Sequence, residues 1–342
     1  MDSATAAAII ADMNHSSFLR RRVLAVASAA LVAMLPLSGQ AQTAFPDKPV
    51  KLTVGFPPGT GPDVVARLLA QKLGELLKQQ VVVDNKAGAG GQIAAQTVAK
   101  SAPDGYNLLL GEVGSIAIAP PAFSKLPYDP ARELVGLSEV VRADFLLVVP
   151  ATSPHKTVAD LVKASKARGD KTNMGTFGAG TPGHFGAELF ADAAGFKIEP
   201  IHYRATGDAV TAIVAGDVSG AFVSTALGAA QIKGGKMRAL ATTAAQRSAL
   251  LPEVPTFAES GMPSIDFSAW FAVFAPAGTP TAVMDQLNRQ IVAAVQAPET
   301  RSKLQEAGFS VSGTSRADTE RMLKAEATRW AAAVKATGFK GD

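Results

Sequence analysis

The sequence predicts an α/β protein that folds into two lobes. Its 342 residues exceed the roughly 250 to 300 at which a single hydrophobic core stops growing. Short β-branched runs, glycine-rich turns and apolar helical patterns alternate along the chain, which is typical of βα units around mainly parallel sheets. Two apolar runs, Phe145–Val149 and Phe267–Phe274, stand where strands would carry the chain from one lobe to the other and back.

The N-terminal segment has the pattern of a secretory signal peptide. Arg20–Arg22 precede the apolar stretch Val23–Leu37, and the small residues of Gly39–Ala41 suit a cleavage site. The apolar stretch is shorter than the roughly 20 residues that a spanning helix needs. We therefore expect residues 1–41 to be cleaved during export to the periplasm, with Met13 as an alternative start. The loose pattern around the arginines argues against a twin-arginine route.

The segment that follows predicts two βα units and a third strand of the first lobe. Its strands and helices are recognised by β-branched runs and by apolar residues at helical spacing. The predicted elements are the strand Val50–Val54, the helix Val64–Leu77, the strand Val81–Val83, the helix Gln92–Lys100 and the strand Tyr106–Leu110.

The middle of the chain repeats the pattern, and two helices complete the C-terminal part. The predicted elements are the helix Thr157–Lys166, with Thr157 as its cap, the strand Asn173–Phe177 and the helix Gly183–Ala194. A second set of strands and helices follows over Ile198–Tyr203, Ala209–Val214, Ala221–Ser224 and Met237–Thr242. The last two helices, Thr281–Gln296 and Arg316–Ala336, each have Thr or Ser nearby as a cap. We assign residues 42–146 and 268–342 to lobe 1 and residues 147–267 to lobe 2. The hinge then consists of two crossing strands.

Glycine-rich turns fall where strands end and helices begin, which is the edge of an open α/β sheet where ligands bind. In the turn Phe56–Asp63, Pro62 suits the first turn of a helix and Asp63 is able to accept early amide protons. Helix starts attract anions because unpaired N–H groups and the positive end of the dipole point outward. An ordinary capped helix is the structural alternative for this turn.

A second turn, Gly178–His184, matches the G-x-G-x-x-G spacing of dinucleotide-binding folds. The match is rejected because the turn lies in mid-chain, contains Pro182 and shows no convincing acid after the following strand. Thr181 as the N-cap, with Pro182 at the first helical position, is the better account. It leaves the amides and the Thr181 hydroxyl free for a carboxylate.

Further small and hydroxyl residues lie at similar junctions. Gly88–Gly91 allows close approach of a ligand to the backbone. His184 and Arg204 are candidates for contact with a ligand oxygen, although packing and a structural ion pair are the alternatives. Trp270 is expected in the core rather than in the cleft. The predicted substrate-binding residues are Pro58, Gly59, Thr60, Asp63, Ala89, Gly90, Gly114, Ser115, Gly180, Thr181, His184, Thr206, Ser224 and Thr225.

Composition argues against several other classes of function. Cysteine is absent, which excludes disulfides, thiol nucleophiles and Cys-ligated metals. There is no G-x-S-x-G elbow, P-loop or H-E-x-x-H motif, and His155, His184 and His202 are too scattered for a metal cluster. The net charge is +4, and acidic and basic residues are interspersed, so the sequence does not indicate a nucleic-acid-binding surface. We expect no catalytic residues, metal or cofactor.

Many short motifs, in order along the mature chain, resemble the Bug family of periplasmic receptors of tripartite tricarboxylate transporters. They are Phe45–Val50, the Phe-Pro-Pro-Gly turn with Asp63 and Arg67, Asn85–Gly91, Pro103–Tyr106, Leu126–Pro130, Gly180–Pro182 with His184, His202–Arg204, Arg238–Ala241, Leu251–Thr256, Trp270, Ala275–Pro280 and Trp330.

The resemblance implies a two-lobe periplasmic binding protein fold, a Venus flytrap of type II-like topology. It implies a carboxylate held by loop amides, hydroxyls and waters, and delivery by a monomer to the membrane subunits of such a transporter. A ligand-presenting receptor for a sensor kinase and a periplasmic hydrolase are the alternatives. The turn Gly59–Pro62 and Ala205 depart from the family pattern, and both stand in predicted ligand loops.

Overall fold

The computed structural model describes residues 45–203 and 205–341. The predicted signal peptide, residues 1–41, and Arg204 lie outside the described residues. Within the described ranges, no helix has the length and apolar character needed to cross a membrane.

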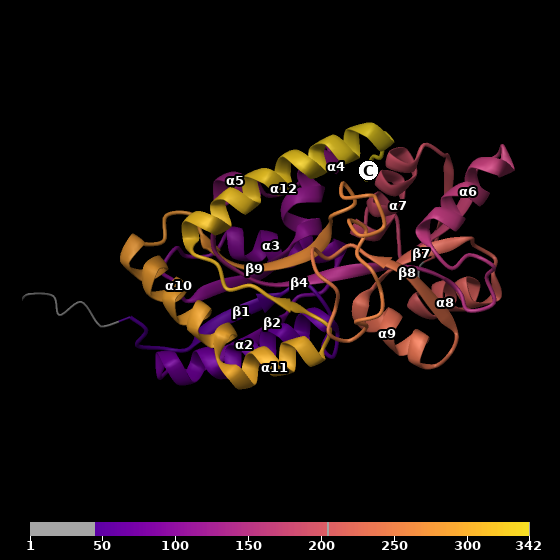
Figure 1. Ribbon diagram of the computed structural model, residues 1–342. Coiled ribbons are helices and arrows are strands. Elements are labelled where there is room, and N and C mark those ends of the chain that lie inside the picture. The colour runs from indigo at the N-terminus through magenta and orange to yellow at the C-terminus, as the bar shows by residue number, and fades with distance from the viewer. Residues whose placement is uncertain (1–44, 204, 342) are drawn as a thin grey trace, which may run out of the picture. The chain divides into compact units, whose positions relative to one another are not determined.

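The first sheet begins with three parallel strands, β1 (Val50–Val54), β2 (Val81–Asn85) and β3 (Asn107–Glu112). Val54, the last residue of β1, is in register with Asn85 and with Leu110, so the carboxyl ends of the three strands meet at one edge. Helices and turns join or cover this sheet (Figure 1): α2 (Gly61–Leu77), the one-turn η1 (Ala89–Gly91), α3 (Gln92–Ala99), η2 (Gly114–Ile118), α4 (Ala119–Ala122), α5 (Pro130–Glu133), α10 (Thr281–Gln296) and α11 (Pro298–Glu306).

The long strand β4 (Leu134–Pro150) belongs to two sheets. Its first part, Leu134–Asp144, pairs antiparallel with β9 (Ser268–Pro276), which in turn pairs with β3. Its second part, from Phe145 on, pairs with β7 (Gly220–Ser224) and β8 (Met237–Thr242). Strands are present at both predicted positions. β4 pairs in both sheets, whereas β9 pairs only in the first sheet. The sequence pattern identified only the second part of β4.

The second sheet is built around β5 (Thr172–Thr176), which pairs in parallel with β6 (Ile198–His202) and with β7. Its helices are α6 (Val158–Arg168), α7 (Pro182–Ala194), α8 (Thr206–Ala215) and α9 (Thr225–Lys233). Among the described residues, the strand order is β2-β1-β3-β9-β4-β7-β5-β6, with β8 and the short β10 (Ser310–Val311) also on β4.

Several sequence-based expectations need correction. The sheets are mixed rather than mainly parallel, because β4 and β9 add antiparallel pairs at the centre. Helix α10 begins after Pro280 with no side-chain cap, whereas α6 and α12 (Arg316–Thr337) are capped by Thr157 and Ser315 as predicted. The helices α9 and α11 were missed.

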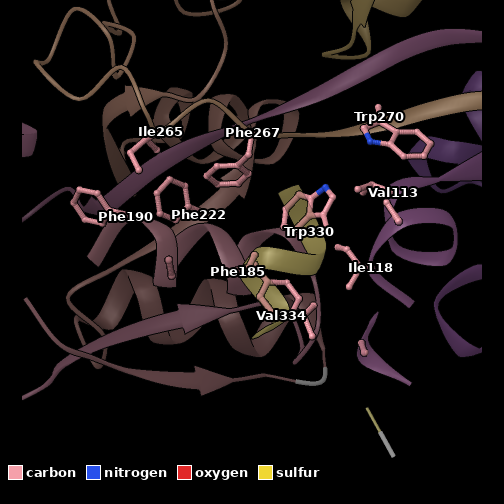
Figure 2. Packing of buried hydrophobic residues seen from close by; sticks show 14 of the residues in the cluster. Val113, Ile118, Phe185, Phe190, Phe222, Ile265, Phe267, Trp270, Trp330 and Val334 are labelled. Atoms are coloured by element: carbon pink, nitrogen blue, oxygen red, sulfur yellow. The ribbon is translucent and has the colours of Figure 1, made fainter. Parts of the chain in front are cut away.

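The C-terminal helix α12 joins the cores of the two sheets. One buried cluster contains residues of β3, β4, β7, β9 and α12, and Figure 2 shows Trp330 between Phe185 of α7 and Val113. The indole N–H groups of Trp270 and Trp330 both donate to Glu326 Oε2, each at 2.9 Å. Trp270 is fully buried, which confirms the expected core position.

Replacing Glu326 with Ala should destabilise the protein by about 2 to 5 kcal/mol, because two buried indole N–H groups lose their acceptor. Urea unfolding measures the loss. Glu320→Ala is the matched control on the same helix, since Glu320 pairs with Lys324 in solvent and its loss should change the free energy of unfolding far less than the loss of Glu326. Equal losses in the two variants would contradict this role for Glu326.

Candidate ligand-binding site

The carboxyl ends of β1, β2 and β3 bring together two predicted turns and a third turn that contains the predicted site residues Gly114 and Ser115. We call these three turns the first turn cluster (residues 57–63, 88–91 and 112–115). A Cβ placed on Gly55, just after β1, would lie 2.5 Å from Gly91 Cα. A Cβ on Gly91 would lie 3.5 Å from Ser115 Oγ. The three turns are therefore in contact, as expected for parallel strands that end at one edge.

The turn before α2 is held by the buried carboxylate of Asp63. Its Oδ2 accepts from Gly59 N–H at 2.9 Å and from Arg67 Nε at 2.8 Å, and its Oδ1 accepts from Asn85 Nδ2 at 2.9 Å. The hydrogen bond from Arg67 is the main reason that the pKa of Asp63 falls to about 2. The carboxylate thus stays ionised and fixes the turn, and it accepts from Gly59 rather than from the first helical amides.

The glycine-rich turn after β2 has an unusual backbone. Gly88, Ala89, Gly90 and Gly91 all have positive φ, and Ala89 has φ +46°. Left-handed backbone in a residue with a side chain is uncommon and is often retained at functional sites. A Cβ on Gly90 or on Gly59 would meet no atom within 4 Å, so both backbones border open space.

The third turn surrounds a buried acid, Glu112, which is not among the predicted site residues. Glu112 ends β3, and its Oε1 accepts from Ser115 N–H at 2.9 Å. Burial raises the pKa of Glu112 to about 7, although the backbone hydrogen bonds from Gly114 and Ser115 act to lower it. An acid that ends an apolar strand beside Gly114 and Ser115 was the available signal.

The ends of β5, β6 and β7 form a second turn cluster (residues 178–184, 202–203, 205–206 and 224–225). Thr176 Oγ1 and His202 Nδ1 lie 2.7 Å apart at the ends of β5 and β6. The rings of His184 and His202 pack edge to face at 4.7 Å between centroids. The turn before α7 is therefore in direct contact with the end of β6.

Thr181 caps α7 with Pro182 in the first turn, as predicted. The hydroxyl of Thr181 is not free, however, because it donates to Gly178 O at 2.9 Å and accepts from His184 N–H at 3.3 Å. The His184 ring is buried, and its Nδ1 accepts from Gly180 N–H at 3.1 Å. Burial, and then His202, lower the pKa of His184 to about 4, so the ring is neutral and carries its proton on Nε2.

Other predicted hydroxyls are used in the same way, as donors to backbone carbonyls inside the protein. These bonds run from Thr60 to Pro57 O at 2.7 Å, from Ser115 to Glu112 O at 3.2 Å, and from Thr225 to Asp144 O at 3.0 Å. Ser224 caps α9 by accepting from Leu227 N–H, and Thr206 is exposed at the start of α8. The hydroxyls of Thr60, Ser115, Thr181 and Thr225 therefore already hold backbone carbonyls of the protein.

The turn before β10 lies beside the first cluster and beside Ala226, which follows the second cluster. A Cβ on Gly61 would lie 3.2 Å from Phe309 Cζ, and a Cβ on Gly308 would lie 2.8 Å from Ala226 Cβ. The starts of α2 and α9 thus flank one short segment, Gly308–Phe309. On another side, Phe339 packs near Gly180 and against the ring of His184.

A cavity of about 720 Å³ lies elsewhere, between the start of α6, β8 and the loop 253–260. None of its lining residues is a predicted site residue. Arg238 lines this cavity, and its guanidinium group donates to the backbone carbonyls of Ala151, Ser153 and His155. We therefore place the candidate site at the turn clusters, where amides rather than committed side chains are presented.

Comparison with known proteins gives consistent matches. Residues 65–339 match the family model described as tripartite tricarboxylate transporter family receptor. Protein BugT of Bordetella pertussis is 34% identical over 96% of this chain and 99% of the relative. R. palustris Rpa4515 with adipate is 33% identical with a TM-score of 0.75, covering 86% of this chain and 99% of that one. MatC from Rhodopseudomonas palustris with bound malate is 28% identical with a TM-score of 0.71, covering 85% and 100%.

The neutral, buried His184 should make stability depend on pH. The unfolded chain takes up a proton near pH 6.5 and the folded one near pH 4, so the free energy of unfolding falls as pH drops through this window. Relative to His184→Gln, the wild type should lose about 3 kcal/mol between pH 7 and pH 4.

Urea unfolding of both proteins at several pH values gives this difference directly. His155→Gln is the control, because it replaces an imidazole with an amide at a position outside the two clusters. A difference between wild type and His184→Gln that does not change with pH would contradict a buried, neutral His184.

Proposed function

This chain belongs to the receptor family of tripartite tricarboxylate transporters, and from that premise we propose that it binds one small organic carboxylate between its two turn clusters and delivers it to the transporter. Proteins of this family are periplasmic solute receptors. We infer that residues 1–41 direct export and are cleaved, and that the mature receptor meets the membrane subunits as a monomer.

One observation carries the proposal: each cluster presents the start of a helix at the carboxyl ends of parallel strands. In the first, α2 and η1 begin next to backbone that borders open space at Gly59 and Gly90. In the second, α7 begins at the turn fixed by Thr181 and His184. Helix starts offer N–H groups without intrahelical partners and a positive dipole end, which suit a carboxylate.

Carboxylates are the ligand class that this chemistry favours. The related proteins named above were solved with adipate and with malate, and both ligands carry two carboxylates. Arg67, the cation of the first turn, is already paired with Asp63. Backbone amides then hold one carboxylate, and the second end of the ligand sets specificity.

Closure of two lobes on the ligand follows from the same arrangement. We assign residues 42–146 and 268–342 to one lobe and residues 147–267 to the other, with β4 and β9 as the crossing strands. A ligand that contacts both turn clusters favours the closed form by its higher affinity for that form.

A receptor rather than an enzyme is the better account of this site. His184 and Asp63 are each engaged in holding a turn, and Glu112 is bonded to the amides beside it. We therefore expect the ligand to be released unchanged.

A thermal-shift screen of organic carboxylates, including adipate and malate, tests the proposal. A bound ligand should raise the melting temperature, because it binds the folded state, and mass spectrometry should recover it unaltered. Consumption of the ligand would point to a hydrolase instead. Deletion of the gene should abolish uptake of the same carboxylate, whereas lost induction with normal uptake would indicate a sensor.

Thr181→Val should weaken binding of that carboxylate by about 1 to 3 kcal/mol, because the turn that presents the α7 amides loses both bonds of the Thr181 hydroxyl. Isothermal titration calorimetry measures the affinity. Thr157→Val is the matched control, since Thr157 caps α6 in the same way outside both clusters. Both variants should lose stability of about 1 kcal/mol, and only Thr181→Val should lose affinity. Equal affinity in both would remove this turn from the site.

A further inference from the structure

Glu112 is a buried acid inside the first turn cluster, and its role is not explained by the fold. The residue is 8% exposed, and its carboxylate accepts from the N–H groups of Ser115 and Gly114. These amides are among those predicted to receive the ligand. An internal carboxylate thus occupies the position at which the turn would attract an anion.

The backbone around Glu112 leaves space for its carboxylate. A Cβ on Gly114 would lie 2.5 Å from Glu112 Oε1, and a Cβ on Gly91 would lie 3.8 Å from the same atom. Any side chain at position 114 would collide with the carboxylate. The glycines that open the turn to a ligand also place Glu112 directly beneath it.

The charges on the surrounding elements do not neutralise Glu112. In the described part of the chain, η1, α4 and β9 carry no charged side chain. Lys51 of β1 pairs with Asp84, and Lys100 after α3 pairs with Glu133.

Two further titratable groups face this region. Tyr128 donates its hydroxyl to Ser115 O at 2.6 Å, and Glu326, the buried acid of α12, is held by two indoles. Tyr128 is neutral at physiological pH, because burial and the nearby Glu112 raise its pKa. Among residues 45–203 and 205–341, Glu112 therefore has amide and hydroxyl neighbours and no charged partner that shifts its pKa.

We propose that the first turn cluster takes up one proton, on the carboxyl of Glu112, together with each carboxylate ligand. The inference rests on the proposed function. The ligand carboxylate brings a second negative charge next to the first, and like charges in one site favour protonation of one group. The proton comes from solvent and adds to a Glu112 oxygen, which leaves the ligand ionised and the amides available to it.

Proton uptake has a definite consequence for affinity. Burial already raises the pKa of Glu112 to about 7, and the bound anion raises it further. Affinity is highest where Glu112 is protonated in both states. It falls as pH rises above about 7, by up to about tenfold per pH unit, until the pKa of the complex is reached.

The first measurement needs no ligand. In protein labelled with ¹³C at glutamate Cδ, the resonance of Glu112 is identified by its loss in Glu112→Gln and followed from pH 4 to pH 9. We expect a midpoint near pH 7. A midpoint near 4.5, the ordinary value for glutamate, would overturn the proposal.

The second measurement uses adipate and malate as probes, each at a concentration that saturates the thermal shift. A bound probe should move the Glu112 midpoint upward. In titration calorimetry, wild-type affinity should fall from pH 7 to pH 9, whereas that of Glu112→Gln should stay level. The matched control Glu326→Gln, which removes another buried acid outside the turn clusters, should follow the wild type.

Binding without a shifted midpoint, or equal pH dependence in wild type and Glu112→Gln, would refute proton uptake while leaving the carboxylate receptor intact. If no carboxylate binds, the proposed function fails, and the ligand-free midpoint still decides whether Glu112 holds a proton near neutral pH.

Discussion

Both halves of this molecule depend on one strand that pairs into two sheets. The first part of β4 continues the sheet of β1, β2 and β3 through β9, and its second part joins β7 and β8. The switch falls at Asp144, whose carbonyl accepts from Thr225 and whose carboxylate accepts from Ser310. Helix α12 is fixed to β9 by Glu326, which accepts hydrogen bonds from the indoles of Trp270 in β9 and of Trp330 in α12.

In these two sheets, the position of the candidate site follows from the direction of the parallel strands. Parallel strands in each sheet end at a common edge, and the turns that leave this edge begin helices. Side chains with perturbed pKa values serve these turns: ionised Asp63 ties the first, and neutral His184 ties the turn before α7. Their charge states are set by an arginine partner in one case and by burial in the other.

Local patterns predicted most of the elements, because β-branched runs and helical spacing are visible without tertiary contacts. They identified the turns at Gly59, Gly90 and Thr181, and the caps Thr157 and Thr181. They missed the first part of β4, whose polar residues Glu139 and Arg142 obscure a strand that is held by long-range pairing. They also could not show that the hydroxyls of Thr181 and Thr225 donate to backbone carbonyls, or that the Glu112 carboxylate packs against Gly114. Those contacts exist only in the folded chain.

The central claim is that one carboxylate bridges the two turn clusters and draws them together. The chain has no cysteine, so spin labels on Ile93→Cys and Asp208→Cys, both at exposed positions beside the first and second cluster, report a single distance. Pulsed electron paramagnetic resonance without and with the stabilising carboxylate measures it. A shorter, narrower distance distribution in the presence of ligand is the result that the account predicts, and an unchanged distribution at saturating ligand would contradict it.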